Sequence, residues 1–374
     1  MNTVERIAAL GQRIWYDNIS RDLLGSGRLK ALVAAGVRGV TTNPTIFEKA
    51  VRDSSQYDDD LRRLREAGTD PGTWVRALMV ADVRQAADIL RPVYDRSLGE
   101  DGYVSIEVDP HKAYDTDATI AEAALLWREV ARPNVMIKIP GTPPGLAAVR
   151  QTVRAGINVN VTLLFSPSRY DEAANAYLAA LDDRLKDGQT IDRVASVASV
   201  FVSRVDTEVD ALLKARIQTA PTAEAKRLQG LMGRAGSANA QRIYQRYKDI
   251  FRSKGFARLR ARGARPQWPL WASTSTKDPA LSPVWYIDRL IAPDTINTVP
   301  PVTFDALTTH GRPRALLEAE LPQAQGILDS LRREGIDIGG ILDQLAVRGV
   351  EAFTASFESL AQQLAAKQAA LAQA

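Results

Sequence analysis

Apolar and polar residues alternate along this chain in two recurring patterns, one typical of buried strands and one typical of helices. Eight short runs rich in β-branched or apolar residues are expected to form strands, at residues 13–17, 37–43, 103–109, 134–140, 157–165, 194–202, 269–273 and 296–300. The segments between them carry apolar residues at helical spacing. The alternation predicts parallel strands joined by helical crossovers.

Two of the helical segments have clear predicted boundaries. In residues 26–36, Ser26 can cap the helix, and Gly36 stands where a left-handed residue commonly ends one. In residues 141–156, Thr142 can cap a helix with prolines in its first turn, and Gly156 is the predicted stop.

Eight strand and helix units suit a closed α/β barrel, the (β/α)8 or TIM barrel. An open doubly wound sheet is the alternative, but residues 23–30 (LLGSGRLK) lack the glycine-rich phosphate-binding turn that usually follows its first strand. We expect one elaborated domain over residues 1–374. Two long connections, 48–102 and 206–264, are predicted to be helical insertions, and 303–374 is predicted to form C-terminal helices that pack on the barrel.

Composition excludes several classes of protein. With 374 residues, of which 45% are hydrophobic and 25% charged, the chain can bury a substantial core, so disorder is not expected. There is no cysteine, which excludes disulfides, thiol nucleophiles and thiolate metal sites, and two histidines are too few for a three-histidine metal site. The N-terminus lacks the apolar core of a secretory signal, and no apolar run reaches the roughly 18 residues that span a bilayer. We expect a cytoplasmic protein.

Charge favours small anionic ligands. The formal net charge of +4 suits phosphorylated substrates and falls short of the dense basic stripe of a nucleic-acid binder. The basic stretch at 252–266 is interpreted as solvated surface, so we expect neither a nucleic-acid nor a membrane partner. Nothing in the pattern predicts an oligomeric state.

Polar residues interrupt several of the predicted strands, although barrel strands should be nearly continuous apolar runs. The interruptions lie at or near the ends of the strands: Asp17, Asn43, Glu107, Lys138, Asn160, Thr162 and Ser199. In a (β/α)8 barrel the carboxyl ends of the strands surround one mouth, where catalytic groups are built. An unpaired buried charge costs several kcal/mol, so the three ionisable residues need partners or a chemical task.

Lys138 stands between Ile137 and Ile139 in a chain that has only eleven lysines. One interpretation is a side chain that extends to the barrel mouth or forms a structural ion pair. The other is an amine whose pKa is lowered by desolvation, so that its neutral form can attack a carbonyl. Asp17 and Glu107 taken singly suit helix caps or loop anchors, but two carboxylates and a lysine at one rim favour the catalytic interpretation.

Five segments resemble transaldolase motifs in order and spacing: TTNPTIF (41–47), IEVDP (106–110), IKIPGT (137–142), INVNVTLLFS (157–166) and VASVFVSRVD (197–206). The later LWASTSTKDP (270–279) and INTVPPVT (296–303) are similar to the longer bacterial members. The resemblance implies a (β/α)8 barrel with a Schiff-base lysine and no metal or organic cofactor. It implies a pentose phosphate pathway transferase that moves a dihydroxyacetone unit from a ketose phosphate (sedoheptulose 7-phosphate or fructose 6-phosphate) to an aldose phosphate (glyceraldehyde 3-phosphate or erythrose 4-phosphate).

The same resemblance implies catalytic roles for four residues. Lys138 is expected to be the nucleophile at the ketose C2 carbonyl, and Asp17 to exchange a proton with the C4 hydroxyl. Glu107 is expected to shuttle protons through a water that Thr162 holds.

Substrate binding is implied at a second set of positions. Three residues are expected to bind hydroxyl groups of the dihydroxyacetone unit: Asn43, Asn160 and Ser199. Arg204 is expected to capture phosphate, with Lys277 as the second basic group and Ser275 and Thr276 as further hydrogen-bonding groups. Shorter transaldolases have an arginine after the seventh strand, so Lys277 is also consistent with a solvated loop lysine.

Two alternatives to transaldolase activity stay open. A lyase of the fructose-6-phosphate aldolase branch would release free dihydroxyacetone, but those shorter relatives carry glutamine and tyrosine where this chain has Glu107 and Phe201, so both positions favour transfer. A non-catalytic barrel that serves as a binding protein would be expected to lose Lys138, Asp17 or Glu107, and this chain keeps all three.

Overall fold

Eight parallel strands close into a barrel in sequence order, β1 to β8, in the computed structural model, which describes residues 1–52 and 54–373. Asp53 and Ala374, which fall in the predicted segments 48–102 and 303–374, lie outside the described residues. The strands are β1 Gln12–Tyr16, β2 Gly39–Val40, β3 Tyr103–Glu107, β4 Val135–Pro140, β5 Val159–Leu164, β6 Ser196–Phe201, β7 Trp268–Ala272 and β8 Thr295–Val299. All eight predicted strands are confirmed, and the open doubly wound alternative is wrong.

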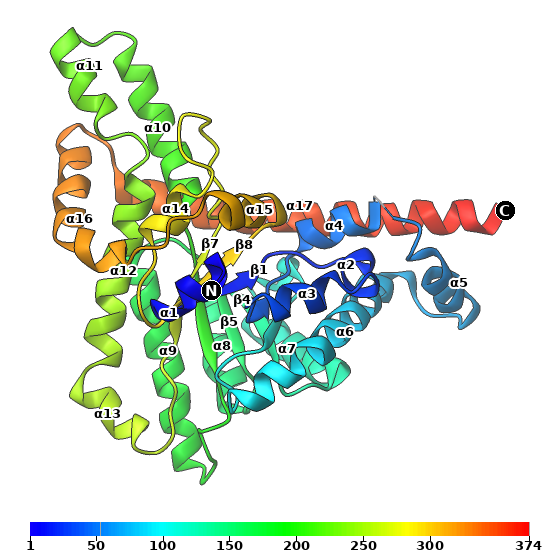
Figure 1. Ribbon diagram of the computed structural model, residues 1–374. Helices are drawn as coiled ribbons and strands as arrows, with labels where there is room; N and C mark the ends of the chain where they lie inside the picture. The colour runs from blue at the N-terminus through cyan, green and yellow to red at the C-terminus, as the bar shows by residue number, and fades with distance from the viewer. Residues whose placement is uncertain (53, 374) are drawn as a thin grey trace.

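Helices follow the strands on the outside of the barrel (Figure 1). In chain order they are α1 Thr3–Ala9, α2 Arg21–Gly25, α3 Arg28–Ala34, α4 Pro44–Arg52, α5 Asp58–Glu66, η1 Pro71–Thr73, α6 Trp74–Arg96, η2 Pro110–Lys112, α7 Thr116–Val130, α8 Pro143–Arg154, α9 Pro167–Lys186, α10 Ser203–Ile217, α11 Thr222–Gln229, α12 Ala235–Phe251, α13 Lys254–Arg260, α14 Trp285–Arg289, α15 Pro301–His310, α16 Leu316–Arg333 and α17 Ile338–Gln373.

One of the two predicted helix caps is confirmed and one is wrong. Thr142 caps α8, because its side-chain oxygen accepts a hydrogen bond from the Gly145 amide. Ser26 is instead the C-cap of α2, and the N-cap of α3 is Gly27, which has a φ of 81° and lets the backbone turn between two short helices.

The register explains why polar side chains interrupt the strands. Side chains alternate between the two faces of a strand, and residues paired across parallel strands point to the same face. Glu107 pairs with Lys138, and Lys138 pairs with Asn160. All three therefore point to the inner face of the barrel near its carboxyl end.

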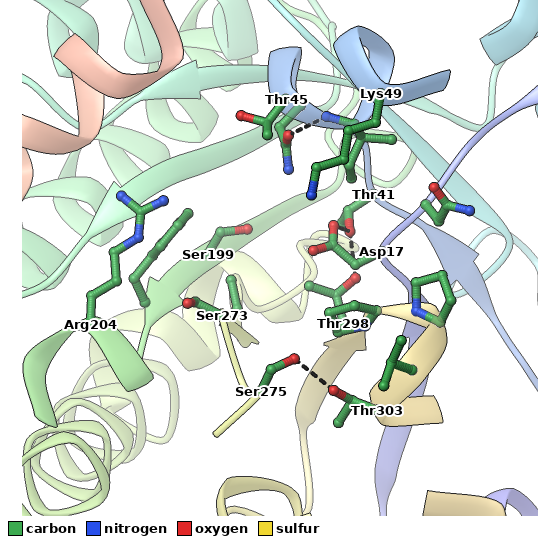
Figure 2. A pocket seen from close by; sticks show the side chains of 18 of the residues that line it. Asp17, Thr41, Thr45, Lys49, Ser199, Arg204, Ser273, Ser275, Thr298 and Thr303 are labelled. Carbon is green, nitrogen blue, oxygen red and sulfur yellow. Dashed lines mark hydrogen bonds between the residues drawn. The ribbon is translucent and has the colours of Figure 1, made fainter. Parts of the chain in front are cut away.

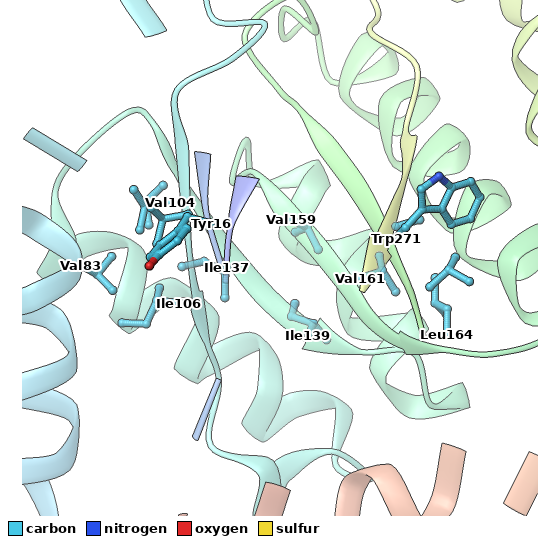
Figure 3. Close-up of a cluster of buried hydrophobic side chains, with 14 of the residues drawn as sticks. Tyr16, Val83, Val104, Ile106, Ile137, Ile139, Val159, Val161, Leu164 and Trp271 are labelled. Atoms are coloured by element: carbon cyan, nitrogen blue, oxygen red, sulfur yellow. The ribbon is translucent and has the colours of Figure 1, made fainter. Parts of the chain in front are cut away.

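The alternate, outward-facing residues form the main hydrophobic core between barrel and helices. Figure 3 shows this layer, in which Val104 and Ile106 of β3 lie close to Val83 of α6, and Ile137 and Val159 continue the layer on β4 and β5. These strand residues are fully buried. Burial of apolar surface outside the barrel fixes the strands, at about 25 cal/mol for each Å² removed from water, and leaves the inner face available for polar groups.

The predicted insertions coincide with helices. The segment 48–102 contains α5 and α6, and 206–264 contains most of α10 together with α11, α12 and α13. Figure 1 shows α10 and α11 extending away from the barrel beside α16. The division into one domain with these insertions stays a prediction. In the basic stretch 252–266, Arg258 forms an ion pair with Asp182 at 2.6 Å, as expected for a surface segment.

The last helix, α17, crosses the carboxyl end of the barrel instead of following its outer wall (Figure 1). It packs against α4, α10 and the end of β5. A bulge in β5 places Leu163 in the left-handed region, with a φ of 57°. A Cβ atom at Gly349 of α17 would lie 2.9 Å from a methyl group of Leu163, so the glycine lets the helix approach the strand without displacing that side chain.

Candidate active site

A cavity of about 700 Å³ opens at the carboxyl ends of the strands. Figure 2 shows side chains from β6, β8, α4 and the loops after β1 and β7 that point into it. Nine of the sequence-predicted site residues line it: Asp17, Asn43, Lys138, Ser199, Phe201, Arg204, Ser275, Thr276 and Lys277. The other three, Glu107, Asn160 and Thr162, are buried on the inner faces of β3 and β5. The structure thus brings together residues that are up to 260 positions apart in the sequence.

Lys138 is buried, with its amino group enclosed by protein. The residue is 4% exposed. Nζ lies 3.2 Å from Glu107 Oε2 and donates a hydrogen bond of 3.0 Å to the Thr42 carbonyl oxygen. The amine therefore has a carboxylate on one side and the open cavity on the other.

Glu107 is a buried carboxyl group that can gain and lose a proton near neutral pH. Burial raises its pKa to about 7, while the neighbouring Lys138 ammonium opposes that rise. The contact with Lys138 is an ion pair without good hydrogen-bond geometry, because neither Glu107 oxygen accepts a hydrogen bond within the described part of the chain. A carboxyl group with these properties can exchange protons in both directions.

Asp17 follows β1 and faces the cavity (Figure 2). Burial raises its pKa, and the charge of Lys138 and a hydrogen bond from Thr41 act in the opposite direction. The Thr41 hydroxyl donates to Asp17 Oδ1 at 2.6 Å and also contacts the Thr298 hydroxyl. These contacts fix the orientation of the carboxylate. Thr41 and Thr298 were not predicted as site residues.

A buried polar chain connects three strands below the cavity. Ser199 donates to Asn160 Oδ1 at 2.6 Å, and Asn160 Nδ2 donates to the Ser105 hydroxyl at 3.0 Å. Since both the oxygen and the nitrogen of the Asn160 side-chain amide form hydrogen bonds, the orientation of the amide is fixed. Ser199 lies at the edge of this chain and lines the cavity.

Asn43 has a structural contact as well as a place in the cavity wall. Its Oδ1 accepts a hydrogen bond of 3.0 Å from the Ile46 amide, at the beginning of α4. The side-chain NH2 is then the group of Asn43 that remains to donate to a ligand.

Thr162 is fully buried on β5 and pairs with Pro140 of the neighbouring strand β4. Its hydroxyl has no hydrogen-bond partner in residues 1–52 and 54–373. Such buried polar groups are commonly satisfied by ordered water.

The charges that line the cavity are mainly positive. Asp17 is the acidic residue of the described lining, and the basic residues are Lys49, Lys138, Arg204 and Lys277. Burial lowers the pKa of Arg204, whose guanidinium lies over the Phe201 ring at 5.0 Å and forms no ion pair with any described residue. Lys277 is exposed on the loop after β7. This distribution favours an anionic ligand.

Lys49 was missed by the sequence analysis. It lies on α4, and Figure 2 shows its side chain reaching into the cavity from the wall opposite Arg204. The signal was weak: Lys49 follows the TTNPTIF motif by only two positions, but it stands outside the motif on a helix that carries other charged residues.

Phe353 of α17 was also missed. It lines the cavity, its ring centroid lies 6.5 Å from that of Phe201, and Lys138 Nζ lies 5.7 Å from its ring. Phe201 packs in turn on Phe165, at 5.4 Å. These rings form an apolar wall beside the amine.

The arrangement supports covalent chemistry at a carbonyl group. It combines a buried amine, a carboxyl group with a pKa near neutrality, a second carboxylate and hydroxyl-binding groups in a cationic cavity. In the described residues, no group of His, Asp and Glu side chains is placed to hold a metal ion. Among the helices of residues 1–52 and 54–373, none has the length and apolar character to cross a membrane.

Comparison with known proteins gives one consistent result. The model of the family "Transaldolase/Fructose-6-phosphate aldolase" matches residues 14–364. The chain is 48% identical to a transaldolase of Acidothermus cellulolyticus (95% of this chain, 94% of the relative) and 45% identical to a transaldolase of Frankia alni (96% and 95%). It is 45% identical to "Transaldolase 2" of a Nostoc species, over 98% of both chains. This chain belongs to the transaldolase/fructose-6-phosphate aldolase family.

Proposed function

We propose that the protein is a transaldolase, which transfers a dihydroxyacetone unit between sugar phosphates of the pentose phosphate pathway through a Schiff base on Lys138. One observation carries the proposal: Lys138 Nζ is buried at a strand end, 3.2 Å from a carboxyl group whose pKa is about 7, and faces a cationic cavity. We place the enzyme in the cytoplasm.

In the first step, neutral Lys138 attacks the C2 carbonyl of the ketose phosphate. The amine gives up a proton and the carbonyl oxygen gains one, which yields a neutral carbinolamine. A further proton, given to the carbinolamine hydroxyl group, lets that group leave as water and leaves a protonated imine. Glu107 is the proton carrier for these transfers, because its pKa lets it act as acid and base at neutral pH. The unpartnered Glu107 oxygens and Thr162 hydroxyl support a relay through a water held between them.

In the second step, the carboxylate of Asp17 takes the proton of the C4 hydroxyl. The C3–C4 bond breaks, the aldose phosphate leaves as an aldehyde, and the bond's electron pair passes into the imine to give an enamine on Lys138. An acceptor aldehyde then reverses the steps. The hydrogen bond from Thr41 keeps Asp17 in one orientation for both directions.

The remaining residues bind the substrate. The amide of Asn43 and the Asn160–Ser199 pair are proposed to hold hydroxyl groups of the dihydroxyacetone unit, so that the enamine stays bound while the aldehydes exchange. Arg204 is proposed to bind the phosphate, with Lys277 and Ser275 from the loop after β7. The Ser275 hydroxyl lies 2.6 Å from that of Thr303 and is thereby fixed in place.

The second candidate is the lyase reaction, in which the enamine is protonated and free dihydroxyacetone is released. The name of the matching family covers both activities. Phe201 and Phe353 line the cavity near Lys138 with rings that carry no hydroxyl group, which disfavours a water beside the enamine and supports transfer.

Borohydride trapping tests the proposal. Reduction in the presence of fructose 6-phosphate should fix the three-carbon unit on Lys138, as read by mass spectrometry of the peptides. Lys138→Met should abolish the adduct. Lys248→Met is the matched control, since Lys248 forms an ion pair of the same 3.2 Å length with Glu318 on the outer helices. The proposal fails if wild-type protein turns over without an adduct, or if the adduct maps to another lysine.

A second measurement separates transfer from cleavage. Wild-type protein should form product rapidly when an aldose phosphate acceptor is present and release little dihydroxyacetone without it. Equal rates with and without acceptor would assign the lyase reaction.

A further inference from the structure

The helix that covers the mouth is fastened at several points along its length. Before Phe353, Arg348 pairs with Glu208 of α10 at 3.1 Å. After it, Ser356 contacts the Thr45 hydroxyl at 2.8 Å, and Lys367 pairs with Asp58 of α5 at 3.2 Å. The position of Phe353 above Lys138 therefore depends on contacts between α17 and the helices α4, α5 and α10 around the barrel mouth.

One of these contacts involves His111, on η2 directly after the strand that carries Glu107. The imidazole lies edge-on to the Phe357 ring, with centroids 5.9 Å apart. Its Nδ1 lies 2.7 Å from Asp109 Oδ1, and its Nε2 lies 3.1 Å from Glu358 Oε1. Phe357 is one helical turn beyond Phe353 on α17.

Both ring nitrogens of His111 thus face a carboxylate. A neutral imidazole has one N–H and can donate to one of these groups, while its second nitrogen would present a lone pair to an anion. The imidazolium donates to both. Lys112, the neighbour of His111 on η2, is paired with Glu122 of α7.

We propose that His111, as an imidazolium, is a positioning residue that links Asp109 to Glu358 and so holds α17 with Phe353 over Lys138. This inference rests on the proposed function, because a held Phe353 excludes water from the enamine on Lys138. His111 does not touch the cavity and acts through the helix.

The link has a defined dependence on pH. The carboxylates of Glu358 and Asp109 raise the pKa of His111 above its ordinary value of 6.5. Since the folded pKa is the higher one, the stabilisation is complete below pH 6.5 and is lost as the pH rises through the folded pKa. Glu107, with a pKa of about 7, titrates in the same range, so variants must be compared with wild-type protein at each pH.

Hydrogen exchange along α17 tests the link without relying on catalysis. At about pH 6, His111→Gln and Glu358→Gln should speed exchange of the amides at 350–358 by about two- to fivefold, as expected for a partly exposed ion pair. His111→Arg keeps a permanent positive charge and should retain protection at every pH. Lys367→Gln is the matched control, and it should affect only amides farther along the helix.

The same variants test the effect on the reaction. Release of dihydroxyacetone without acceptor, divided by the rate of transfer, should rise about two- to fivefold in His111→Gln at pH 6, and the difference from wild-type protein should vanish at high pH. The inference is overturned if exchange at 350–358 is unchanged in His111→Gln, if His111→Arg behaves like His111→Gln, or if the rate ratio matches that of Lys367→Gln. Failure of the proposed function would appear separately, as a wild-type protein without a Lys138 adduct.

Discussion

Replacing Glu107 by glutamine should remove a loss of folding stability that wild-type protein suffers between pH 4.5 and pH 8, while it removes activity. Glutamine has nearly the same shape as a protonated glutamic acid but never ionises. In the wild-type protein, the fully buried Glu107 side chain must carry its charge in the barrel interior when the pH exceeds its folded pKa. The variant avoids that cost and loses the proton carrier.

The magnitude follows from the pKa of about 7, against an ordinary value of 4.5. Below pH 4.5 the carboxyl group is protonated in both the folded and unfolded states, so it adds no pH dependence. Between pH 4.5 and 7 the unfolded state loses its proton while the folded state keeps it, so the free energy of unfolding falls as the pH rises. At about 1.36 kcal/mol for each pH unit, the full cost above pH 7 is about 3 kcal/mol.

Denaturant unfolding of both proteins at pH 4.5 and pH 8 measures this difference. The stability of Glu107→Gln relative to wild-type protein should rise by about 3 kcal/mol between the two conditions, which corresponds to about 4 °C in Tm at an unfolding entropy of about 2.1 cal/mol/K per residue. Transfer activity should fall by at least about 10²-fold. Glu318→Gln, in the outer ion pair with Lys248, is the control. The reasoning is refuted if the stability gap is the same at both pH values.

Three further changes test other parts of the site and fold. Arg204→Gln should lower kcat/KM for phosphorylated donors by at least about tenfold, because a charge-assisted contact to phosphate is lost; an equal loss with unphosphorylated sugars in initial-rate assays would contradict that assignment. Phe201→Tyr adds a hydroxyl group to the wall near Lys138 and should raise the release of dihydroxyacetone without acceptor; unchanged release would argue against a role for this ring. Gly39→Ala would place a Cβ atom 2.4 Å from the Trp15 ring and should cost about 1–3 kcal/mol in denaturant unfolding; an unchanged midpoint would show that the barrel floor can repack.

Strand periodicity was sufficient to predict the barrel, because each strand is apolar on its outer face and each connection is helical. The details of the strands were harder to predict. The run 37–43 contributes only Gly39–Val40 as a strand, since the chain turns into α4 at Pro44. The run 157–165 was predicted as a regular strand and contains a bulge at Leu163. A leucine in an apolar run gives no sign that its backbone is left-handed.

The candidate site was predictable where a polar residue broke an apolar run, as Lys138 and Glu107 did. Phe353 gave no such signal, because an aromatic residue in an amphipathic helix is most simply read as core. Its place in the cavity depends on where α17 crosses the barrel, and that is decided by contacts such as Gly349 on Leu163, between residues almost 190 positions apart. Lys49 was missed because a lysine on a helix is usually solvated.

The helix across the mouth also has a consequence for the order in which the enzyme is made. All eight strands are translated before α17, so a nascent barrel can assemble its lysine and both carboxyl groups while the mouth is still uncovered. A ketose captured at that stage would meet bulk water without the Phe353 ring beside it. Faithful transfer is therefore a property acquired late in synthesis, when residues 338–373 dock on a barrel that is already complete.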